Sequence, residues 1–412
     1  MVSAAIGSSE TELKNPDAVG NLYETPDRKD RKYDKGGRLI EDKTYHYHYD
    51  DLGNLIFKEY RKSEFSQIIS SRTLEKEYNV KSKSTGTGWL YIWMKNGMLQ
   101  EVIRPNGKKV QFEYDGFGRR IAKIYNNRIT RYLWDGNILL QEWNYDLNER
   151  PVLQVGELGE LFYNKSEPIE NLVTWIYEEG GFTPIATIKE DKYYSIVSDY
   201  MGTPKQGYDI EGNLIWQREL DVYGNPVIGK NDFMPFLYQG QYVDLETGDA
   251  YNRFRYYSPE TGLYLSQDPI GILGANSTLY AYVKDVNSSV DIFGLHEVIA
   301  ILDGNPVTTP KGGYSWYSTP GSSKAPFNGF GAAGHSEAKL LEHLEKTQGG
   351  NLKGSNLEII SMGQMTKGGK GQLSTLPPCD RCLKGIEAFA KKHGIDISYK
   401  WDNGEIKFKG CK

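Results

Sequence analysis

The feature that most constrains the fold is a short motif, Tyr-Asp-x-x-Gly followed by Arg or Asn, which recurs along the chain. Its four copies begin at Tyr33, Tyr49, Tyr114 and Tyr208. In each copy an Asp that can accept backbone hydrogen bonds stands three residues before a Gly that tolerates the positive φ of a tight turn. Each copy therefore predicts a β-hairpin.

Composition agrees with a chain built from many hairpins. The 412 residues include 45 Gly and 30 Tyr, whereas only 38% are hydrophobic. This balance favours short strands joined by turns over packed helices. Because one hairpin cannot bury an apolar face, we expect neighbouring hairpins to join in a continuous sheet. The length predicts at least two domains.

The repeats resemble the YD repeats of the Rhs and teneurin-like proteins, whose sheets spiral into a hollow shell. The segments YQGQYVDLETGDAYNRFRYYSPETGLYLSQDPIG and LYAYVKDVNSSVDIFGL are similar to the Rhs-associated core that closes such a shell. We therefore expect an irregular N-terminal segment over residues 1–30, a YD-repeat β-sheet over 31–230 and the Rhs core over 231–295. So few repeats imply a fragment of a shell.

The same resemblance implies that the chain cuts itself. In related shells an Arg and two Asp near the end of the core release the downstream segment by aspartyl autoproteolysis, and Arg255, Asp268 and Asp291 stand in the matching motif. Two carboxylates that share a proton can activate water, and the cut is expected after Leu295. The chain has Ile292 where the family has Pro, which removes a fixed φ near the scissile bond. Turn and salt-bridge roles are the alternative for the three residues.

Charge divides unevenly along the chain. Residues 296–412 hold 15 Lys plus Arg against 11 Asp plus Glu, a net charge of +4, so the overall −5 leaves −9 for residues 1–295. The basic part permits a polyanionic substrate, although a Lys-rich surface is usually only solvated. The N-terminal sequence lacks the pattern of a secretory signal, and no apolar stretch approaches the roughly 18 residues of a membrane span.

Residues 296–412 predict a compact α/β domain with three layers (αβα). GHSEAKLLEHLEKTQGG places Leu341 and Leu344 at helical spacing and ends in a Gly pair, and LEIISMG forms a short strand. CDRCLKGIEAFAKKHG forms a second helix after a Pro pair. IDISYKW and EIKFKG follow as strands joined by Asp-Asn-Gly, a hairpin signal.

The beginnings of the two predicted helices carry the residues of a metal site. His335 and Glu337 lie at the first, and the sequence PCDRC begins 41 positions after Glu337 at the second. Catalytic zinc takes three protein ligands and leaves one position for water. Two Cys three positions apart at a helix start present both sulfurs on one face, where the helix dipole favours thiolates. We expect His335, Cys379 and Cys382 to bind Zn²⁺ while Glu337 moves protons.

This pattern resembles the signature of the cytidine deaminase-like superfamily, in the branch used as polymorphic bacterial toxins. The resemblance implies that water activated at zinc attacks C4 of a cytosine, while Glu337 carries a proton to the ring nitrogen and then to the leaving ammonia. Adenine is the alternative base. A lone C-x-x-C also occurs in redox pairs and in structural zinc sites, where His343 or His393 would supply a second histidine.

Aromatic and basic residues near the motif are candidates for substrate contacts. Trp316, Tyr317 and Phe330 precede the first helix, and aromatic faces in a loop stack on single-stranded bases. Core packing is the alternative for each of them. Lys370 and Arg381 flank the motif and are candidates to follow phosphates, which would make binding salt-dependent.

These features predict an interbacterial toxin in which an Rhs shell carries and releases a zinc-dependent deaminase of cytosine in nucleic acid, DNA rather than RNA. Expected partners are single-stranded DNA or RNA, a cognate immunity protein, and a secretion apparatus or the rest of the shell. The chain would be exported or displayed at the cell surface, and the toxin domain would act in the target-cell cytoplasm. The competing hypothesis is a surface adhesin with a zinc-stabilised module that has no enzymatic activity.

Overall fold

A computed structural model of the chain describes residues 2–6, 10–179, 181–268, 278–283, 286, 290–292, 294, 297–302, 305–306, 315–317, 340–341, 343–345, 352–353, 355–361, 380–401 and 404–410. The chain divides into two compact units. The sheet unit comprises Leu39–Glu178 and Thr183–Glu260. The terminal unit comprises Met1–Arg38, Glu179–Phe182 and Thr261–Lys412.

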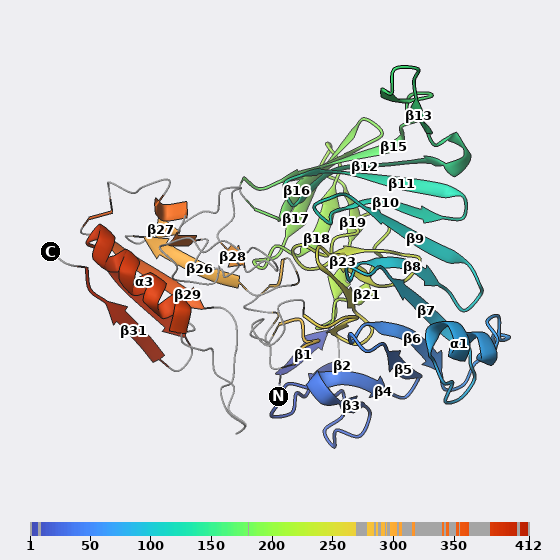
Figure 1. The fold of residues 1–412 in the computed structure, drawn as a ribbon, viewed down its shortest axis with the longest axis horizontal. Coiled ribbons are helices and arrows are strands. Elements are labelled where there is room, and N and C mark those ends of the chain that lie inside the picture. The colour runs from blue at the N-terminus through green and yellow to red at the C-terminus, as the bar shows by residue number, and fades with distance from the viewer. Residues whose placement is uncertain are drawn as a thin grey trace. The chain divides into compact units, whose positions relative to one another are not determined.

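A long antiparallel sheet of consecutive hairpins forms most of the sheet unit (Figure 1). Strands that are neighbours in the sheet are neighbours in the sequence, except that β12 pairs directly with β15. From β4 onward, the strands in sheet order are β4 (Arg38–Glu41), β5 (Tyr45–Tyr49), β6 (Leu55–Tyr60), β7 (Gly88–Trp93), β8 (Leu99–Ile103), β9 (Lys109–Tyr114), β10 (Arg120–Tyr125), β11 (Arg128–Asp135), β12 (Ile138–Asp146), β15 (Glu170–Tyr177), β16 (Pro184–Lys189), β17 (Lys192–Ser198), β18 (Pro204–Tyr208) and β19 (Leu214–Gln217). The prediction of hairpins joined in a continuous sheet is confirmed.

Shorter elements complete the sheet unit. Helix α1 (Ser71–Tyr78) lies between β6 and β7, where the Ser70 hydroxyl caps its first turn and Leu74 packs into a small apolar cluster with Phe57 and Leu90. The hairpin between β12 and β15 and the strands after β19 comprise η2 (Leu147–Glu149), β13 (Leu153–Val155), β14 (Leu161–Tyr163), β20 (Glu219–Leu220), β21 (Pro226–Ile228), β22 (Tyr242–Val243), β23 (Ala250–Asn252) and β24 (Arg255–Ser258).

The repeated motif forms a turn that its own Asp side chain closes. One carboxylate oxygen of Asp50 accepts the N–H groups of Leu52 and Asn54 at 2.9 and 2.8 Å. The Gly53 N–H donates to the Asp50 carbonyl oxygen at 3.0 Å, and Gly53 has a φ of +80°. The same bonds recur at Asp115 and Asp209. The predicted capped turn is therefore confirmed for these copies.

The copy at Asp34, in the terminal unit, forms a different turn. Gly36 and Gly37 both have positive φ and lie in the 3-10 turn η1 (Lys35–Gly37), and the Asp34 carboxylate pairs with Arg38 at 2.9 Å instead of capping the backbone. Conversely, the capped turn also forms at positions that lack the preceding Tyr, namely Asp17, Asp199 and Asp221. The Asp and the Gly, and not the Tyr, are what the turn requires.

Buried charges join the segment after β19 to the sheet. Arg120 of β10 is 1% exposed, and its guanidinium donates to Asp244, which also lies 3.2 Å from the Lys123 ammonium. Four aromatic rings surround this guanidinium with centroids 4.7 to 5.4 Å away, those of Phe112, Tyr132, Tyr242 and Tyr251. Residues 231–260, the first part of the expected Rhs core, thus pack on the sheet through paired charges and tyrosines.

The N-terminal part of the terminal unit contains strands that the sequence did not lead us to expect. Residues 1–30 were expected to be irregular, but β1 (Val2–Ile6) and β2 (Glu10–Lys14) form an antiparallel hairpin in which Val2 pairs with Lys14. The hairpin lacks the Asp-x-x-Gly signal on which the expectation was based. Two further strands of this unit are β3 (Lys32–Asp34) and β25 (Leu263–Tyr264).

A separate mixed sheet forms the C-terminal part of the terminal unit. Its strands lie in the order β27-β26-β29-β30-β31, and β28 also pairs with β26. They are β26 (Glu297–Leu302), β27 (Asn305–Pro306), β28 (Ser315–Tyr317), β29 (Asn356–Ser361), β30 (Asp396–Trp401) and β31 (Gly404–Phe408). β29 and β30 are parallel, whereas β30 and β31 form an antiparallel hairpin. The three strands expected in this region are confirmed.

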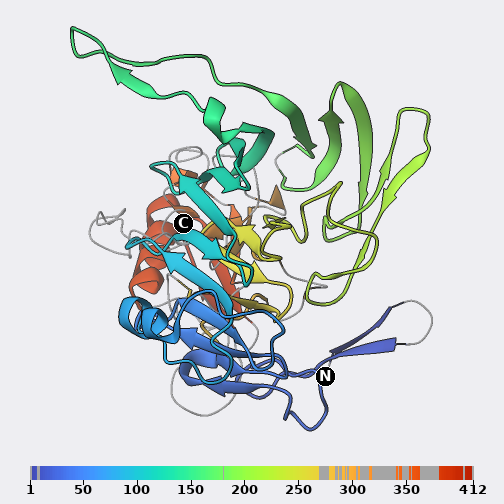
Figure 2. The same cartoon turned by 90° about the vertical axis from the view of Figure 1, so that its right-hand side faces the viewer.

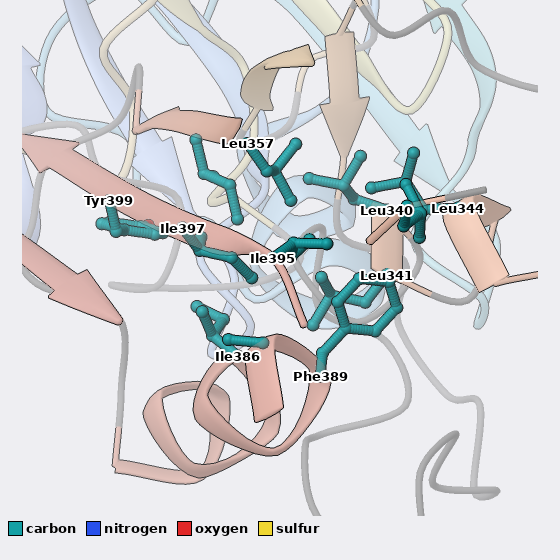
Figure 3. Packing of buried hydrophobic residues seen from close by; sticks show 12 residues of the cluster. Leu340, Leu341, Leu344, Leu357, Ile386, Phe389, Ile395, Ile397 and Tyr399 are labelled. Atoms are coloured by element: carbon teal, nitrogen blue, oxygen red, sulfur yellow. The ribbon is translucent and has the colours of Figure 1, made fainter. Parts of the chain in front are cut away.

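Two helical segments pack on this sheet (Figure 3). Leu340, Leu341 and 343–345 are helical, and helix α3 (Asp380–His393) ends at Gly394, whose φ is +64°. Both share one buried cluster with alternate residues of β29 and β30, namely Leu340, Leu341, Leu344, Leu352, Leu357, Ile359, Ile386, Phe389, Ala390, Ile395, Ile397 and Tyr399. Both therefore cover the same face of the sheet, and within the described residues this part of the chain has two layers rather than the expected three.

Candidate functional site

Most of the predicted metal site lies outside the described residues. This holds for His335, Glu337 and Cys379, whereas Cys382 lies in the first turn of α3, where only its backbone is described. Within the described part of the chain, no group of three or more His, Cys, Asp or Glu could hold a metal ion. The structure adds the contacts between two helical segments near the motif, residues 340–341 with 343–345 and α3.

An ion-pair cluster joins these two helical segments. Glu345, the last described residue of the first helical segment, accepts hydrogen bonds from Lys392 and from His393 Nε2, the latter at 2.7 Å. Burial alone would raise the pKa of Glu345, but these two hydrogen bonds outweigh it and hold the pKa below its ordinary value. The His393 ring also packs on Phe389, with centroids 4.5 Å apart. The described part of the first segment therefore contacts the last turn of α3.

The connection between α3 and β30 shows toward which end of the parallel strands α3 runs. α3 leads through Gly394 and Ile395 directly into β30, and the first helical segment leads into β29. The starts of these parallel strands are tied together, because the Asp396 N–H donates to the Ser355 carbonyl oxygen at 3.1 Å. α3 therefore runs toward the starts of the strands, and Glu345 of the first segment contacts the end of α3.

His393 does not suit the structural zinc site that was the alternative. It lies eleven positions after Cys382, and those positions span about 16 Å of helix. The two residues cannot contact one ion across that distance, because zinc ligands lie about 2 Å from the metal. His393 instead joins the two helices through Glu345.

The expected autoproteolytic residues fall in both units. Arg255 begins β24 of the sheet unit, pairs with Asn252 of β23, and is 1% exposed. Asp268 and Asp291 belong to the terminal unit, and each is 5% exposed. Leu295, at the expected cut, is outside the described residues.

Within the terminal unit, two paired segments hold both aspartates. The Tyr264 N–H donates to the Tyr280 carbonyl oxygen at 2.8 Å, and the Asp268 N–H donates to that of Leu279 at 2.9 Å. The Tyr264 hydroxyl donates to Asp291 Oδ2 at 2.9 Å, and the Asp291 N–H donates to the Tyr282 hydroxyl at 3.4 Å. Both aspartates are thus buried, Asp291 with its carboxylate bonded to a tyrosine and Asp268 with its backbone bonded to the neighbouring segment.

Tyr264 and Tyr282 are site residues that the sequence reasoning missed. Their rings contact each other edge to face with centroids 6.1 Å apart. The alternation of Tyr280 and Tyr282 in LYAYV was an available signal, since alternate residues of a strand face one side.

The expected substrate contacts fall on different kinds of structure. Trp316 and Tyr317, expected in a loop, lie in β28, where they pair with Val298 and Glu297 of β26. The Ser-Trp-Tyr sequence suits an edge strand because aromatic residues favour strands. Arg381 lies in the first turn of α3, described by its backbone alone, and Phe330 and Lys370 lie outside the described residues.

Comparison with known proteins identifies the class. The model of the Teneurin YD-shell family matches residues 19–278. The chain therefore belongs to the Teneurin YD-shell family. The match ends before the C-terminal mixed sheet begins at β26. None of the helices in the described part of the chain is long and apolar enough to cross a membrane.

Individual relatives are much longer than this chain. It is 30% identical over 271 residues to the probable deoxyribonuclease RhsB of Dickeya dadantii (strain 3937), which covers 63% of this chain and 16% of that protein. It is 27% identical over 301 residues to the double-stranded DNA deaminase toxin A of Burkholderia cenocepacia (strain H111), which covers 68% of this chain and 19% of that protein. A crystal structure of TcdB2-TccC3 matches with a TM-score of 0.39 and 20% identity over 61% of this chain and 14% of that one. The chain thus spans less than a fifth of these relatives' length.

Proposed function

We propose that this protein is an interbacterial toxin of the Rhs type whose C-terminal part is a zinc-dependent deaminase of cytosine in nucleic acid, with DNA preferred over RNA. Relatives that share the YD-repeat region carry names of toxins with different activities, a deoxyribonuclease and a DNA deaminase among them. Such variety fits a common carrier with exchangeable C-terminal parts. The proposed activity therefore rests on residues 296–412 and not on the repeats.

The observation that carries the proposal is that the two helical segments pack on one face of the sheet and meet at Glu345 and His393. His335 lies ten positions before Glu345, and Cys382 lies eleven positions before His393. Similar separations in sequence from a shared contact support two motif halves that meet near the carboxyl ends of β29 and β30, where open α/β sheets bind their ligands.

The donor set fits zinc. One imidazole and two thiolates form a three-ligand set that leaves a position for water. α3 begins at Asp380, so Cys379 directly precedes the helix and Cys382 lies in its first turn, where the partial positive charge of the helix end favours thiolates. When bound, zinc would supply an activated water molecule to the substrate.

The chain's own residues would bind the metal and transfer the protons. His335, Cys379 and Cys382 hold the metal. Glu337 takes a proton from the attacking water, gives one to the ring nitrogen N3 as the water oxygen bonds to C4, and delivers a proton to the amino group that leaves as ammonia. Cytosine thereby becomes uracil without an oxidant or reductant. Adenine deamination, with attack at C6, uses the same residues and is the variant to be tested beside it.

The remaining contacts and partners are part of the same proposal. Trp316, Tyr317 and Phe330 would stack on the base, and Lys370 and Arg381 would contact phosphates, so that activity falls as salt rises. A cognate immunity protein would protect the producing cell. The toxin would leave that cell through a secretion apparatus or with the rest of the shell, and it would act in the cytoplasm of the target cell.

Expression of residues 296–412 in bacteria tests the activity. We expect toxicity and accumulated C-to-T changes that disappear with Glu337→Ala and with Cys379→Ala. Matched controls are Glu387→Gln, on an exposed position of α3, and Cys411→Ser, at a cysteine outside the motif, and both should remain toxic. A harmless domain with unchanged genomes and transcripts would support the adhesin hypothesis instead, and A-to-G changes would support the adenine variant.

We also propose that the Rhs core releases this domain by hydrolysis of the Leu295–His296 bond. Asp268 and Asp291 are both buried, as paired acid and base carboxyls need to be to hold different protonation states. One carboxylate takes the proton of the attacking water while the other protonates the leaving amine, and Arg255 steadies the negative charge that develops. Purified protein should give two bands on a denaturing gel and one with Asp268→Asn. An uncut band for both proteins would contradict the proposal.

A further inference from the structure

The hairpin of β13 and β14 is an apolar projection that the sheet unit does not need. β12 and β15, which flank it in the sequence, pair directly with each other, for example Gln141 with Thr174. The hairpin forms its own two-stranded sheet and projects from the main sheet (Figures 1 and 2). Every residue of both strands is exposed. A two-stranded sheet on its own is marginally stable in water, so we expect another surface to cover this one.

One face of the hairpin is entirely apolar. Leu153 pairs with Tyr163, and Val155 pairs with Leu161, so these four side chains share a face. The opposite face carries the pair of Gln154 and Phe162. Val155 is 70% exposed, and Leu158 at the tip is 95% exposed. A contiguous exposed apolar face of this kind marks an interaction surface.

Charge is distributed along the hairpin with opposite signs at its two ends. Glu157 and Glu160 lie at the tip, and exposed Lys165 lies at the base, one position beyond the pair of Val152 and Asn164. Lys165 lies two positions beyond Tyr163, in the bend that follows β14. When two such hairpins stack face to face about a twofold axis with their tips pointing in opposite directions, each Glu157 meets the Lys165 of the other.

We propose that this apolar face is the contact between two copies of this chain. A twofold axis makes the surface its own complement, in shape and in charge. An anionic lipid surface suits the hairpin less well, because its most exposed apolar residue, Leu158, lies between two glutamates. A standard interface buries roughly 800 Å² per partner, more than four side chains of one small hairpin provide, so the dimer is weak and reversible.

Sedimentation velocity of the purified full-length chain over a range of concentrations tests the proposal. We expect a monomer–dimer equilibrium that Leu161→Lys weakens about tenfold or more, since a charge replaces buried apolar area. Gln154→Lys, a lysine at an equally exposed strand position on the opposite face, should leave the equilibrium unchanged. Glu157→Lys and Lys165→Glu should each weaken the dimer, and the double variant should restore it.

Three results would overturn the proposal. They are a monomer at every concentration, a dimer that Leu161→Lys and Gln154→Lys affect equally, and a double charge variant that is no better than either single one. Flotation of a monomeric chain with phosphatidylcholine vesicles, lost with Leu161→Lys, would assign the face to lipid instead. Circular dichroism of each variant confirms that the fold is intact, as expected for fully exposed positions.

Discussion

The main sheet of the sheet unit and the C-terminal mixed sheet are built by opposite means. In the main sheet, strands that follow one another pair with one another, and carboxylates such as that of Asp50 close the turns between them. In the mixed sheet, β26 pairs with β29 across more than fifty residues, and a parallel pair is joined through a helix. The main sheet therefore depends on contacts between strands that are close in the sequence, whereas the mixed sheet depends on contacts between strands that are far apart.

The two regions also differ in what fills their interiors. The main sheet buries charges and several tyrosines, such as Arg120 against Asp244, whereas the mixed sheet buries mainly aliphatic side chains around Leu344, with Phe389 and Tyr399. Removing one residue should therefore be costly for different reasons in each region. Because the buried residues differ, substitutions can be chosen that should destabilise one region and leave the other unchanged.

The largest stability effect is expected for Arg120→Met. The change leaves Asp244 buried without the guanidinium that compensates its charge, which costs roughly 3–5 kcal/mol. Hydrogen exchange followed by mass spectrometry should show faster exchange in peptides from β9–β11 and unchanged exchange in those from β29–β30. The double variant Arg120→Met with Asp244→Leu should recover much of the loss, and if it does not, the charge pair is not what Arg120 contributes.

Leu344→Ala is the matching change in the mixed sheet. Leu344 of the first helical segment is 1% exposed in the cluster it shares with α3, so the cavity should cost about 2–5 kcal/mol. Exchange should accelerate in peptides from α3 and β30, and toxicity of residues 296–412 should fall. Peptides from β9–β11 should not change; if they did, the two regions would not be independent.

The buried carboxyl of Asp249 should make the sheet unit sensitive to pH. Burial raises its pKa to about 7, and the Tyr91 hydroxyl donates to it at 3.3 Å. Because the unfolded chain loses this proton near pH 4, the folded chain holds an extra proton between about pH 4 and 7, and stability falls with rising pH in that window by at most about 1.4 kcal/mol per unit. Denaturation of Asp249→Asn at several pH values should show a flatter profile.

Asp209→Asn provides the contrast for this measurement. Hydrogen bonds from the Asn213 side chain and backbone hold the pKa of Asp209 below its ordinary value. Its contribution is therefore present at neutral pH and is lost only as the pH falls below about 4. If the slope of folding stability against pH between pH 4 and 7 also changed in this variant, the pH dependence in that range could not be assigned to Asp249.

The smallest effect is expected for Asp50→Ala, which removes the cap of one turn. The N–H groups of Leu52, which is exposed, and Asn54, which is buried, both lose an acceptor, so the cost should be about 1–2 kcal/mol, as for a lost helix cap. Local exchange at the β5–β6 turn is the measurement. Asp51→Ala, at the exposed next position, is the control, and an equal effect there would show that the cap is unimportant.

Local chemistry explains which parts of the fold the sequence could predict. The turn at Asp50 and Gly53 needs only five consecutive residues, so its motif was sufficient. The N-terminal hairpin was not predicted because no Asp-x-x-Gly marks its turn. The strand position of Trp316 was not predicted because its partner, Val298, lies 18 residues away. The direct pairing of β12 with β15 likewise depends on residues far apart in the sequence.

The candidate site was predictable to a similar extent. His335, Glu337, Cys379 and Cys382 came from a motif, and the structure adds the contact of Glu345 with the end of α3. The bond from Tyr264 to Asp291 could not be predicted, because 27 residues separate the two side chains and no repeated spacing links them.

The most direct test is conversion of cytosine in single-stranded and double-stranded oligonucleotides by purified protein that contains residues 296–412. We expect uracil and ammonia to form in equal amounts, about one zinc ion per chain, and loss of conversion with Glu337→Gln while zinc remains bound. Zinc binding without any conversion of cytosine or adenine, or equal conversion by Glu337→Gln, would contradict the proposed deaminase.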